Sequence, residues 1–386
     1  MPKLSLARSR SVFVVVVVLA TAAMSMVMAS GASAKGSLKA RTIVRPLKGT
    51  LHNVAPSVPQ LQTWSSKVKV GGTTYHFMMV GGNPKKKLKK PVTTVTVPVI
   101  PLIVKIGSTT LDPTQPFGSC ETQSALNRFM ASPIFDSSTT YSMNGVSEGP
   151  TQYVDAFQRA EFNKFTNPGG KNPGYHVLLN GVAEPAINVT APAGQITGSG
   201  CSQLGRVDIT WFDNYVINTL FPQVEASDGV TPAQFPIFLV RSLVWYDGSF
   251  SNCCILGYHG AFNNPRFGNA LQTYSPTDME LSGQFGSIQD THVAAHEVGE
   301  WINDPTGGNP TPLWGHIGQV SGCQGNLEVG DPLTGTNMPT VSLGGFTYHL
   351  QELAYFSWFY HQSPSWGTGG KYSDNGTFTT FAAKCP

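Results

Sequence analysis

Apolar residues recur with helical spacing in three segments of the chain. Residues 151–165, 207–224 and 290–304 each place their large apolar side chains three or four positions apart. A helix is therefore expected in each segment. The third helix should end before Pro305, because the residue that precedes a proline avoids the α region.

Other segments have the pattern of strands. Residues 92–106 are rich in β-branched residues, and the two prolines within this run favour a position at a sheet edge or at a bulge. Residues 175–180 predict a short strand, and residues 235–247 predict a buried strand because nearly every position is apolar. Residues 346–362 are aromatic and mixed, and they fit either a helix or a strand.

Together these elements predict an α+β domain over residues 111–386, which is long enough to bury one sizeable core. Residues 35–110 are expected to form an N-terminal β-rich arm, or a propeptide-like region, with one edge strand. Residues 248–287 are rich in glycine and asparagine, and the pattern assigns no element to them.

The first 34 residues have the composition of a secretory signal peptide. Three basic residues precede a long apolar run, and the small residues at positions 32–34 offer an A-x-A cleavage site. The alternative is an uncleaved anchor, because about 18 apolar residues can just span a bilayer. Cleavage is favoured, so we expect a secreted protein with no stable membrane insertion.

Charge and cysteine content narrow the class of protein. The chain has 25 basic and 22 acidic residues, and loss of the three basic residues of the signal leaves a net charge of zero. This balance excludes nucleic-acid binding driven by net charge. Six cysteines in an exported chain indicate disulfides. The adjacent Cys253 and Cys254 are expected in two different bridges.

The sequence HVAAHEVGEWINDP, residues 292–305, carries the candidate chemistry. On a helix, His296 and Glu300 are four positions apart and lie on one face, where two side chains can bind one metal ion. Glu297 is turned away from that ligand position but remains close to it, which suits a general base. This arrangement is that of the zinc-peptidase motif HExxH, with Glu300 in place of the second histidine.

A catalytic metal needs a third protein ligand and an open position. We predict Glu328 as that ligand and Asp331 as a partner that orients an imidazole or holds the loop. His259, His292 and His316 are second-shell candidates or alternative ligands. Zn²⁺ is the expected cofactor, although two carboxylate ligands also favour harder divalent metals such as Mn²⁺ or Ca²⁺.

Two neighbours of the motif have expected structural roles. Gly299 disfavours the helix by about 1 kcal/mol relative to alanine, so we expect another backbone segment to pass close to it. Cys323 is expected to anchor the loop that carries Glu328 through a disulfide.

The motif series AAHEVGEWINDP, Trp314 and LEVGD resembles that of secreted zincin-like proteins with an HExxE motif, and distantly that of the plant phosphate-induced, EXORDIUM-type family. The resemblance implies a zincin-like fold, in which a mixed sheet packs on an active-site helix. It places His296 and Glu300 in the ligand positions and Glu297 in the base position.

The favoured hypothesis is a secreted metal-dependent hydrolase, a zinc peptidase acting on a peptide or protein through Glu297 and water activated by the metal. The alternative is a non-catalytic extracellular or cell-wall binding protein on the same fold. A third hypothesis is a metal-free extracellular structural protein, and metal content separates it from the other two.

Overall fold

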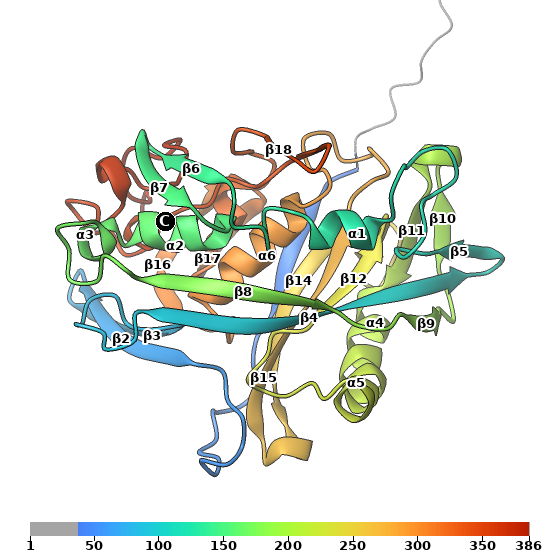
Figure 1. Ribbon diagram of the computed structural model, residues 1–386, viewed down its shortest axis with the longest axis horizontal. Helices are drawn as coiled ribbons and strands as arrows, with labels where there is room; N and C mark the ends of the chain where they lie inside the picture. The colour runs from blue at the N-terminus through green and yellow to red at the C-terminus, as the bar shows by residue number, and fades with distance from the viewer. Residues whose placement is uncertain (1–37, 386) are drawn as a thin grey trace, which may run out of the picture. The chain divides into compact units, whose positions relative to one another are not determined.

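A large, strongly twisted mixed β-sheet dominates the structure, a computed structural model that describes residues 38–385 (Figure 1). The predicted signal peptide, residues 1–34, lies outside the described residues. Only about 19% of the described residues are helical.

The strands of this sheet are β1 (Arg41–Arg45), β4 (Val92–Ile106), β5 (Thr109–Leu111), β8 (His176–Ala183), β9 (Ile187–Thr190), β10 (Gln195–Thr197), β11 (Leu204–Asp208), β12 (Ile237–Arg241), β13 (Leu243–Tyr246), β14 (Cys253–Asn264) and β15 (Ala270–Met279). Separate two-stranded sheets pair β2 (Thr63–Val70) with β3 (Thr73–Val80), β6 (Thr140–Met143) with β7 (Val146–Pro150), β16 (Pro310–Ile317) with β17 (Val320–Asn326), and β18 (Val341–Leu343) with β19 (Phe346–Tyr348).

The helices are α1 (Ala125–Met130), α2 (Tyr153–Glu161), α3 (Asn163–Thr166), α4 (Ile209–Tyr215), α5 (Phe221–Ser227), α6 (His292–Asn303) and α7 (Phe356–Phe359). A π-helical turn, η2 (Val216–Leu220), joins α4 to α5. Short 3₁₀ turns are η1 (Gly200–Ser202), η3 (Pro265–Phe267), η4 (Asp331–Leu333) and η5 (Thr368–Gly370).

Strand order shows how distant segments meet. The main path of the sheet is β10-β11-β13-β14-β15-β12-β4-β5, with β1 paired to β14 and with β8 and β9 paired to β4. Pairing is antiparallel between β14 and both β13 and β15, and it is parallel between β12 and both β15 and β4. The sheet therefore mixes hairpins with crossover connections.

The long strand β4 confirms the strand predicted at 92–106, but it lies inside the sheet rather than at an edge. Its pairing with β8 ends at Val99, and its pairing with β9 begins at Leu102. Pro101 thus lies between these two partner strands, and Pro98 is the second-last residue of β4 that pairs with β8. A residue without an N–H group is tolerated there, because few ladder hydrogen bonds are lost.

The prediction of an α+β, zincin-like fold is wrong, because the chain is mostly β. The main reason is the Gly/Asn-rich segment 248–287, which contains the long strands β14 and β15. Glycine and asparagine are depleted in strands, so the local pattern conceals elements that tertiary packing stabilises. Residues 35–75, which show little hydrophobic period, likewise contain β1 and β2.

The predicted helices are shorter or divided in the structure. The segment 151–165 forms α2 and α3, with a break at Phe162. The segment 207–224 starts inside β11 and continues through α4, the π turn and α5. The predicted strand 235–247 is interrupted at Ser242, where φ is 45° and the chain passes from β12 to β13.

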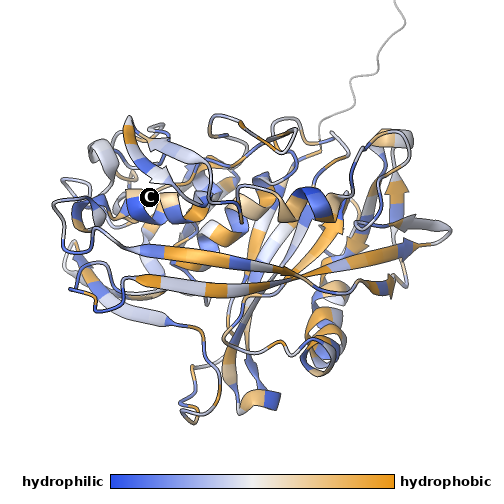
Figure 2. Cartoon of the chain, in the orientation of Figure 1, coloured by the Kyte–Doolittle hydropathy of each residue, from blue (hydrophilic) through white to orange (hydrophobic). Residues whose placement is uncertain are grey.

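Two large apolar clusters lie along the sheet. One contains Val95 and Val97 of β4 together with residues of α2, α6 and the C-terminal segment. The other contains Leu102 and Val104 of β4 together with α4 and α5. Figure 2 shows hydrophobic residues concentrated on β4, β8 and the central strands. The β4 strand therefore contributes to both clusters, and α6 belongs to the first.

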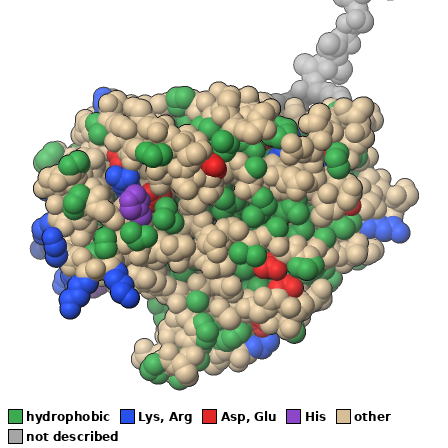
Figure 3. Space-filling view, viewed as in Figure 1, with side chains coloured by type: hydrophobic (Ala, Val, Ile, Leu, Met, Phe, Trp, Pro, Cys, Tyr) green, Lys and Arg blue, Asp and Glu red, His purple; other side chains and the backbone are tan. Residues whose placement is uncertain are grey.

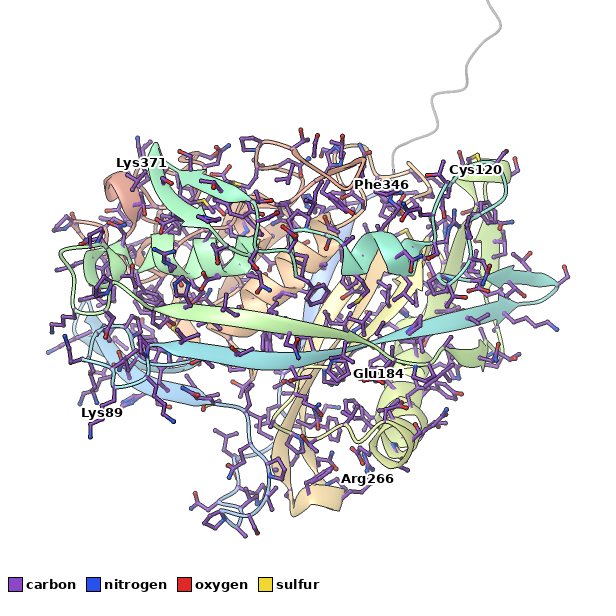
Figure 4. All side chains as sticks on the ribbon, in the orientation of Figure 1. Lys89, Cys120, Glu184, Arg266, Phe346 and Lys371 are labelled. Carbon is purple, nitrogen blue, oxygen red and sulfur yellow. A yellow bond between two sulfur atoms is a disulfide. The ribbon has the colours of Figure 1, made fainter. Side chains whose placement is uncertain are left out.

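The described part of the predicted arm, residues 38–110, belongs to the same compact unit as the rest of the described chain. It supplies β1, β4 and part of β5 to the central sheet. Charged side chains are sparse on the face shown in Figure 3. Lys89, in the loop between β3 and β4, points outward at one end of the molecule (Figure 4).

Three cysteine pairs lie at disulfide distance: Cys120 with Cys201, Cys253 with Cys254, and Cys323 with Cys385. The expectation that the adjacent cysteines serve two bridges is therefore wrong, because they pair with each other. The third bridge confirms Cys323 as an anchor of the segment that leads to Glu328. Among the described residues, no helix has the length and hydropathy needed to cross a membrane.

Candidate metal centre

The helix that carries the motif is buried on every side. All residues of α6 are buried, so it is an internal helix rather than an amphipathic surface helix. It ends at Asp304, whose carboxylate accepts hydrogen bonds from the backbone N–H groups of Gly308 (3.0 Å) and Asn309 (2.6 Å). The DP step predicted to stop the helix therefore also turns the chain into the following loop.

Packing fixes the rotation of α6 about its axis. The Trp301 ring stacks on Phe235 with 3.9 Å between ring centroids, and its Nε1 donates to the Thr273 hydroxyl. A Cβ atom on Gly299 would lie 2.5 Å from Cδ1 of Leu353. The space at Gly299 is thus occupied by a side chain, whereas we expected a passing backbone.

Six titratable side chains from three elements meet beside α6. The helix supplies His296, Glu297 and Glu300, β14 supplies His259, and the chain after β17 supplies Glu328 and Asp331. All six are buried. Their candidate ligand atoms converge in two sets, His296 with Glu300 and Asp331, and His259 with Glu300 and Glu328, with all atoms of a set within 4.8 Å of one another.

Glu300 is common to both sets. The i, i+4 spacing brings Nε2 of His296 to 2.9 Å from Oε1 of Glu300, and the same nitrogen lies 3.6 Å from Oδ1 of Asp331. Glu328 converges with His259 rather than with His296. We predicted that His296, Glu300 and Glu328 bind one ion, and in the structure Asp331 is the carboxylate that accompanies His296.

The outer nitrogen of His296 fixes the orientation of its ring. Nδ1 lies 3.0 Å from Oε1 of Gln351, and the side-chain amide of Gln351 donates to the carbonyl of Gly330. Because that amide oxygen can only accept, Nδ1 carries the proton. The lone pair of Nε2 therefore points into the centre, which is the arrangement that a metal-binding histidine needs.

The ring of His259 is held in the same way. Its Nε2 lies 3.2 Å from the carbonyl oxygen of Asp304, which can only accept. Nε2 therefore carries the proton, and the Nδ1 lone pair faces Oε2 of Glu297 at 3.4 Å and Oε2 of Glu300 at 3.7 Å. Both histidines thus direct a lone pair toward carboxylate oxygens.

The carboxylates are only partly hydrogen-bonded. Oε1 of Glu300 accepts from the backbone N–H of Gly330 at 3.1 Å, and Oε1 of Glu328 accepts from Asn326 at 2.9 Å. Oε2 of Glu300 and Oε1 of Glu297 are buried with no hydrogen-bond partner. Buried polar atoms of this kind are costly unless a further group satisfies them.

Burial and mutual repulsion perturb every group in the centre. Burial raises the pKa of Glu297, Glu300 and Glu328 well above the usual range, and the neighbouring carboxylates raise it further. Burial also raises the pKa of Asp331. It lowers the pKa of His296 and brings that of His259 to about 3.

No lysine or arginine side chain in the described chain pairs with the carboxyl groups of the centre. The ion pairs formed by Glu297, Glu300 and Asp331 in the described chain involve the two histidines, and none involves a lysine or an arginine. Each neutral histidine presents a lone pair to these oxygens. A buried cation satisfies both kinds of atom at once, so the donor set fits a divalent metal.

A surface cavity leads to the centre. It has a volume of about 420 Å³ and is lined by β1, by β17 with its flanking residues, and by Glu328 and Asp331. The cavity therefore reaches Glu328 and Asp331 from the surface, beside β1.

Two of the candidate histidines lie outside the convergent sets. His292 has both ring nitrogens occupied, since Nδ1 lies 2.6 Å from Oδ1 of Asn337 and Nε2 accepts from the backbone N–H of Gly335 at 3.4 Å. Nε2 of His316 lies 3.7 Å from Sγ of Cys323, a cysteine that is disulfide-bonded. Both have structural partners of their own.

Three further residues complete the surroundings of the centre, and the sequence analysis did not identify them: Thr42, Gln319 and Gln351. Gln319 and Gln324 both donate to the carboxylate of Asp331. Uncharged amides and hydroxyls of this kind have no spacing signature, and Thr42 is 254 positions away from His296.

Comparison of the chain with protein-family models, with curated proteins and with solved structures gives no match. The resemblance to EXORDIUM-type proteins therefore stays a prediction, and the site is interpreted from its own geometry.

Proposed function

We propose that this chain is a divalent-metal-dependent hydrolase with its active centre at α6, secreted and acting on polypeptides. One observation carries the proposal. Two buried histidines donate their outer N–H groups to fixed acceptors and direct their inner lone pairs at carboxylate oxygens. One of these oxygens, Oε2 of Glu300, is buried without a hydrogen-bond partner, and so is Oε1 of the neighbouring Glu297. A cation is the group that stabilises this arrangement of lone pairs.

The overlap of the two ligand sets defines where metal would bind. Glu300 converges with His296 and Asp331 in one set and with His259 and Glu328 in the other. His296 lies nearest Oε1 of Glu300, and His259 approaches Oε2. Imidazole and carboxylate donors suit Zn²⁺, and the high share of carboxylate also suits Mn²⁺. A bound divalent ion would polarise a carbonyl group and lower the pKa of water.

Glu297 is the proposed general base. One of its carboxylate oxygens lies 3.4 Å from Nδ1 of His259, and the other has no hydrogen-bond partner. It belongs to neither convergent set, so it remains free to take a proton from water and to transfer it to the leaving amine.

Export is the second part of the proposal. The pattern of residues 1–34 and the three disulfide-distance pairs support an oxidising, extracellular location. Detection of the mature chain in culture medium, beginning at Lys35, tests this part.

The test of hydrolysis uses Glu297→Gln. Quenched, fluorescently labelled unfolded casein is incubated with the zinc-loaded chain, both intact and after a cut in the exposed segment 48–53. We expect the variant to retain metal and to lose at least about 100-fold in rate. Gln223→Glu, on the surface of α5, is the matched control and should leave the rate unchanged. Wild-type hydrolysis by Glu297→Gln would contradict the assignment of the base.

A further inference from the structure

The strand β1 lies across the candidate metal centre. It pairs in parallel with β14, and Val44 stands opposite His259 in the register (Figure 1, blue strand beside β14). The hydroxyl of Thr42 is 2.6 Å from Nε2 of His296. This hydroxyl therefore occupies the position next to the nitrogen lone pair that a metal ion would use.

The contacts that hold Thr42 recognise its backbone. Its N–H donates to Oε1 of Gln319 at 2.8 Å, and Nε2 of Gln319 donates to its carbonyl oxygen at 2.9 Å. Gln319 thus binds the main chain of β1 as a neighbouring strand would. The parallel pairing with β14 adds further main-chain bonds. Such contacts accept any extended segment, as in recognition of peptides by strand addition.

Cavities continue along β1 in both directions. The cavity of about 420 Å³ beside Glu328 and Asp331 is lined by residues 41–44 of β1. A second cavity of about 470 Å³ is lined by residues 44–46, Asp213 and Arg266. β1 therefore lies in a groove that extends beyond the centre on both sides.

Asp213 gives this groove a charge preference. Its Oδ2 lies 3.9 Å from Nε of Arg45, and its Oδ1 accepts a hydrogen bond of 2.6 Å from the Tyr274 hydroxyl. The carboxylate is thus fixed in place at the position of Arg45, three residues after Thr42. A basic side chain is favoured at this position of any segment that replaces β1.

β1 is also attached weakly enough to dissociate from β14 and the groove. Of its five residues only Thr42 is buried, and the other four are partly exposed. The segment that follows it is exposed over residues 48–53, and Leu51 is 51% exposed. Loss of β1 removes less buried apolar surface than loss of an interior strand such as β12, whose five residues are all buried.

We propose that β1 is the resident occupant of a groove that binds an extended polypeptide, with a basic side chain three positions after the residue over the metal centre, and that the chain is latent while β1 is seated. This proposal deepens the proposed function and rests on it for the identity of the bound segment as substrate. Binding by the groove does not depend on hydrolysis.

The experiment uses the folded full-length mature chain with a specific protease site inserted after Leu51. After the cut, the protein is incubated with excess fluorescent peptide LKARTIVRP, which is the sequence of residues 38–46, and is separated from free peptide by gel filtration. We expect uptake of labelled peptide by the cut chain and none by the intact chain. Failure of the cut, still folded chain to take up peptide would overturn the proposal.

Two altered peptides test the specific contacts. Methylation of the backbone nitrogen at Thr42 removes the hydrogen bond to Gln319, and we expect binding at least about tenfold weaker. Arg45→Glu places like charges together at Asp213, and we expect a similar loss. Equal binding of all three peptides would contradict recognition in the β1 register.

The outcome separates this proposal from the hydrolase assignment. The Glu297→Gln chain, cut in the same way, should take up peptide as the wild type does, because Glu297 forms no hydrogen bond or ion pair with residues 41–45. Peptide uptake without hydrolysis of casein would refute the hydrolase assignment and would still support a peptide-binding groove at β1. Hydrolysis that is equally fast before and after the cut would refute latency.

Discussion

The close approach of Gly330 to His296 gives a direct steric test of the centre. A Cβ atom on Gly330 would lie 2.4 Å from Nδ1 of the imidazole and 2.6 Å from its Cγ and Cε1. The backbone at Gly330, with φ −86° and ψ −35°, is open to alanine, so Gly330→Ala adds only this overlap. Ordinary contact begins at 3.4 Å, and the ring must therefore move by about 1 Å.

A shift of this size is large for a metal ligand. Metal–ligand distances tolerate changes of about 0.2 Å, so we expect Gly330→Ala to disrupt the bond from Nε2 of His296. Altered support of a ligand typically lowers metal affinity by about 10- to 100-fold, and we predict at least that loss. The added overlap should also lower stability by about 1–3 kcal/mol.

Isothermal titration of the metal-free protein with Zn²⁺ measures the loss, and circular dichroism checks that the fold persists. Gly174→Ala is the matched control, because its Cβ would meet only Cγ of Pro91 at 3.8 Å. Zinc affinity of Gly330→Ala equal to that of the control would refute the role of His296 as a ligand.

Three further predictions address the same centre. His259→Gln should weaken zinc binding by at least about tenfold, whereas His292→Gln should leave it unchanged, and equal effects in titration would contradict the assignment of the two histidines. In EDTA, melting temperature should fall as pH rises above about 6.5, the usual histidine pKa. The pKa of the three glutamates of the centre is raised in the folded protein, so the folded state keeps protons that the unfolded state has already lost. Rising pH therefore favours the unfolded state, and the stability present at low pH is lost as pH rises through the folded pKa values. Saturating Zn²⁺ should remove this pH dependence. A melting temperature that is independent of pH in EDTA would argue against a raised pKa of these glutamates. Gly299→Ala should destabilise the fold by about 1 kcal/mol in urea unfolding, because overlap with Leu353 exceeds the gain in helix propensity; a net gain would show that Leu353 moves aside.

The local pattern predicts the helix of the centre well. The proposed helix at 290–304 matches α6 within two residues at each end, because the apolar spacing and the Asp304-Pro305 step are both local signals. The i, i+4 approach of His296 to Glu300 follows from helix geometry alone, and it is present in the structure.

The sheet could not be predicted in the same way. Strands β14 and β15 lie in a Gly/Asn-rich segment whose composition disfavours strands, and pairing with distant neighbours stabilises them. The position of His259 depends on that pairing, so the sequence offered it only as an alternative ligand. Thr42 comes from a segment without periodicity, and its contact with His296 depends wholly on long-range strand pairing.

The metal content of the purified mature protein tests the central claim most directly. Wild-type protein and Glu300→Gln are dialysed against Zn²⁺, freed of unbound metal by gel filtration and analysed by elemental mass spectrometry. Because Glu300 belongs to both convergent sets, we predict stoichiometric zinc in the wild type and its loss in the variant. Wild-type protein without stoichiometric metal, or a variant that retains it fully, would contradict a metal centre at α6.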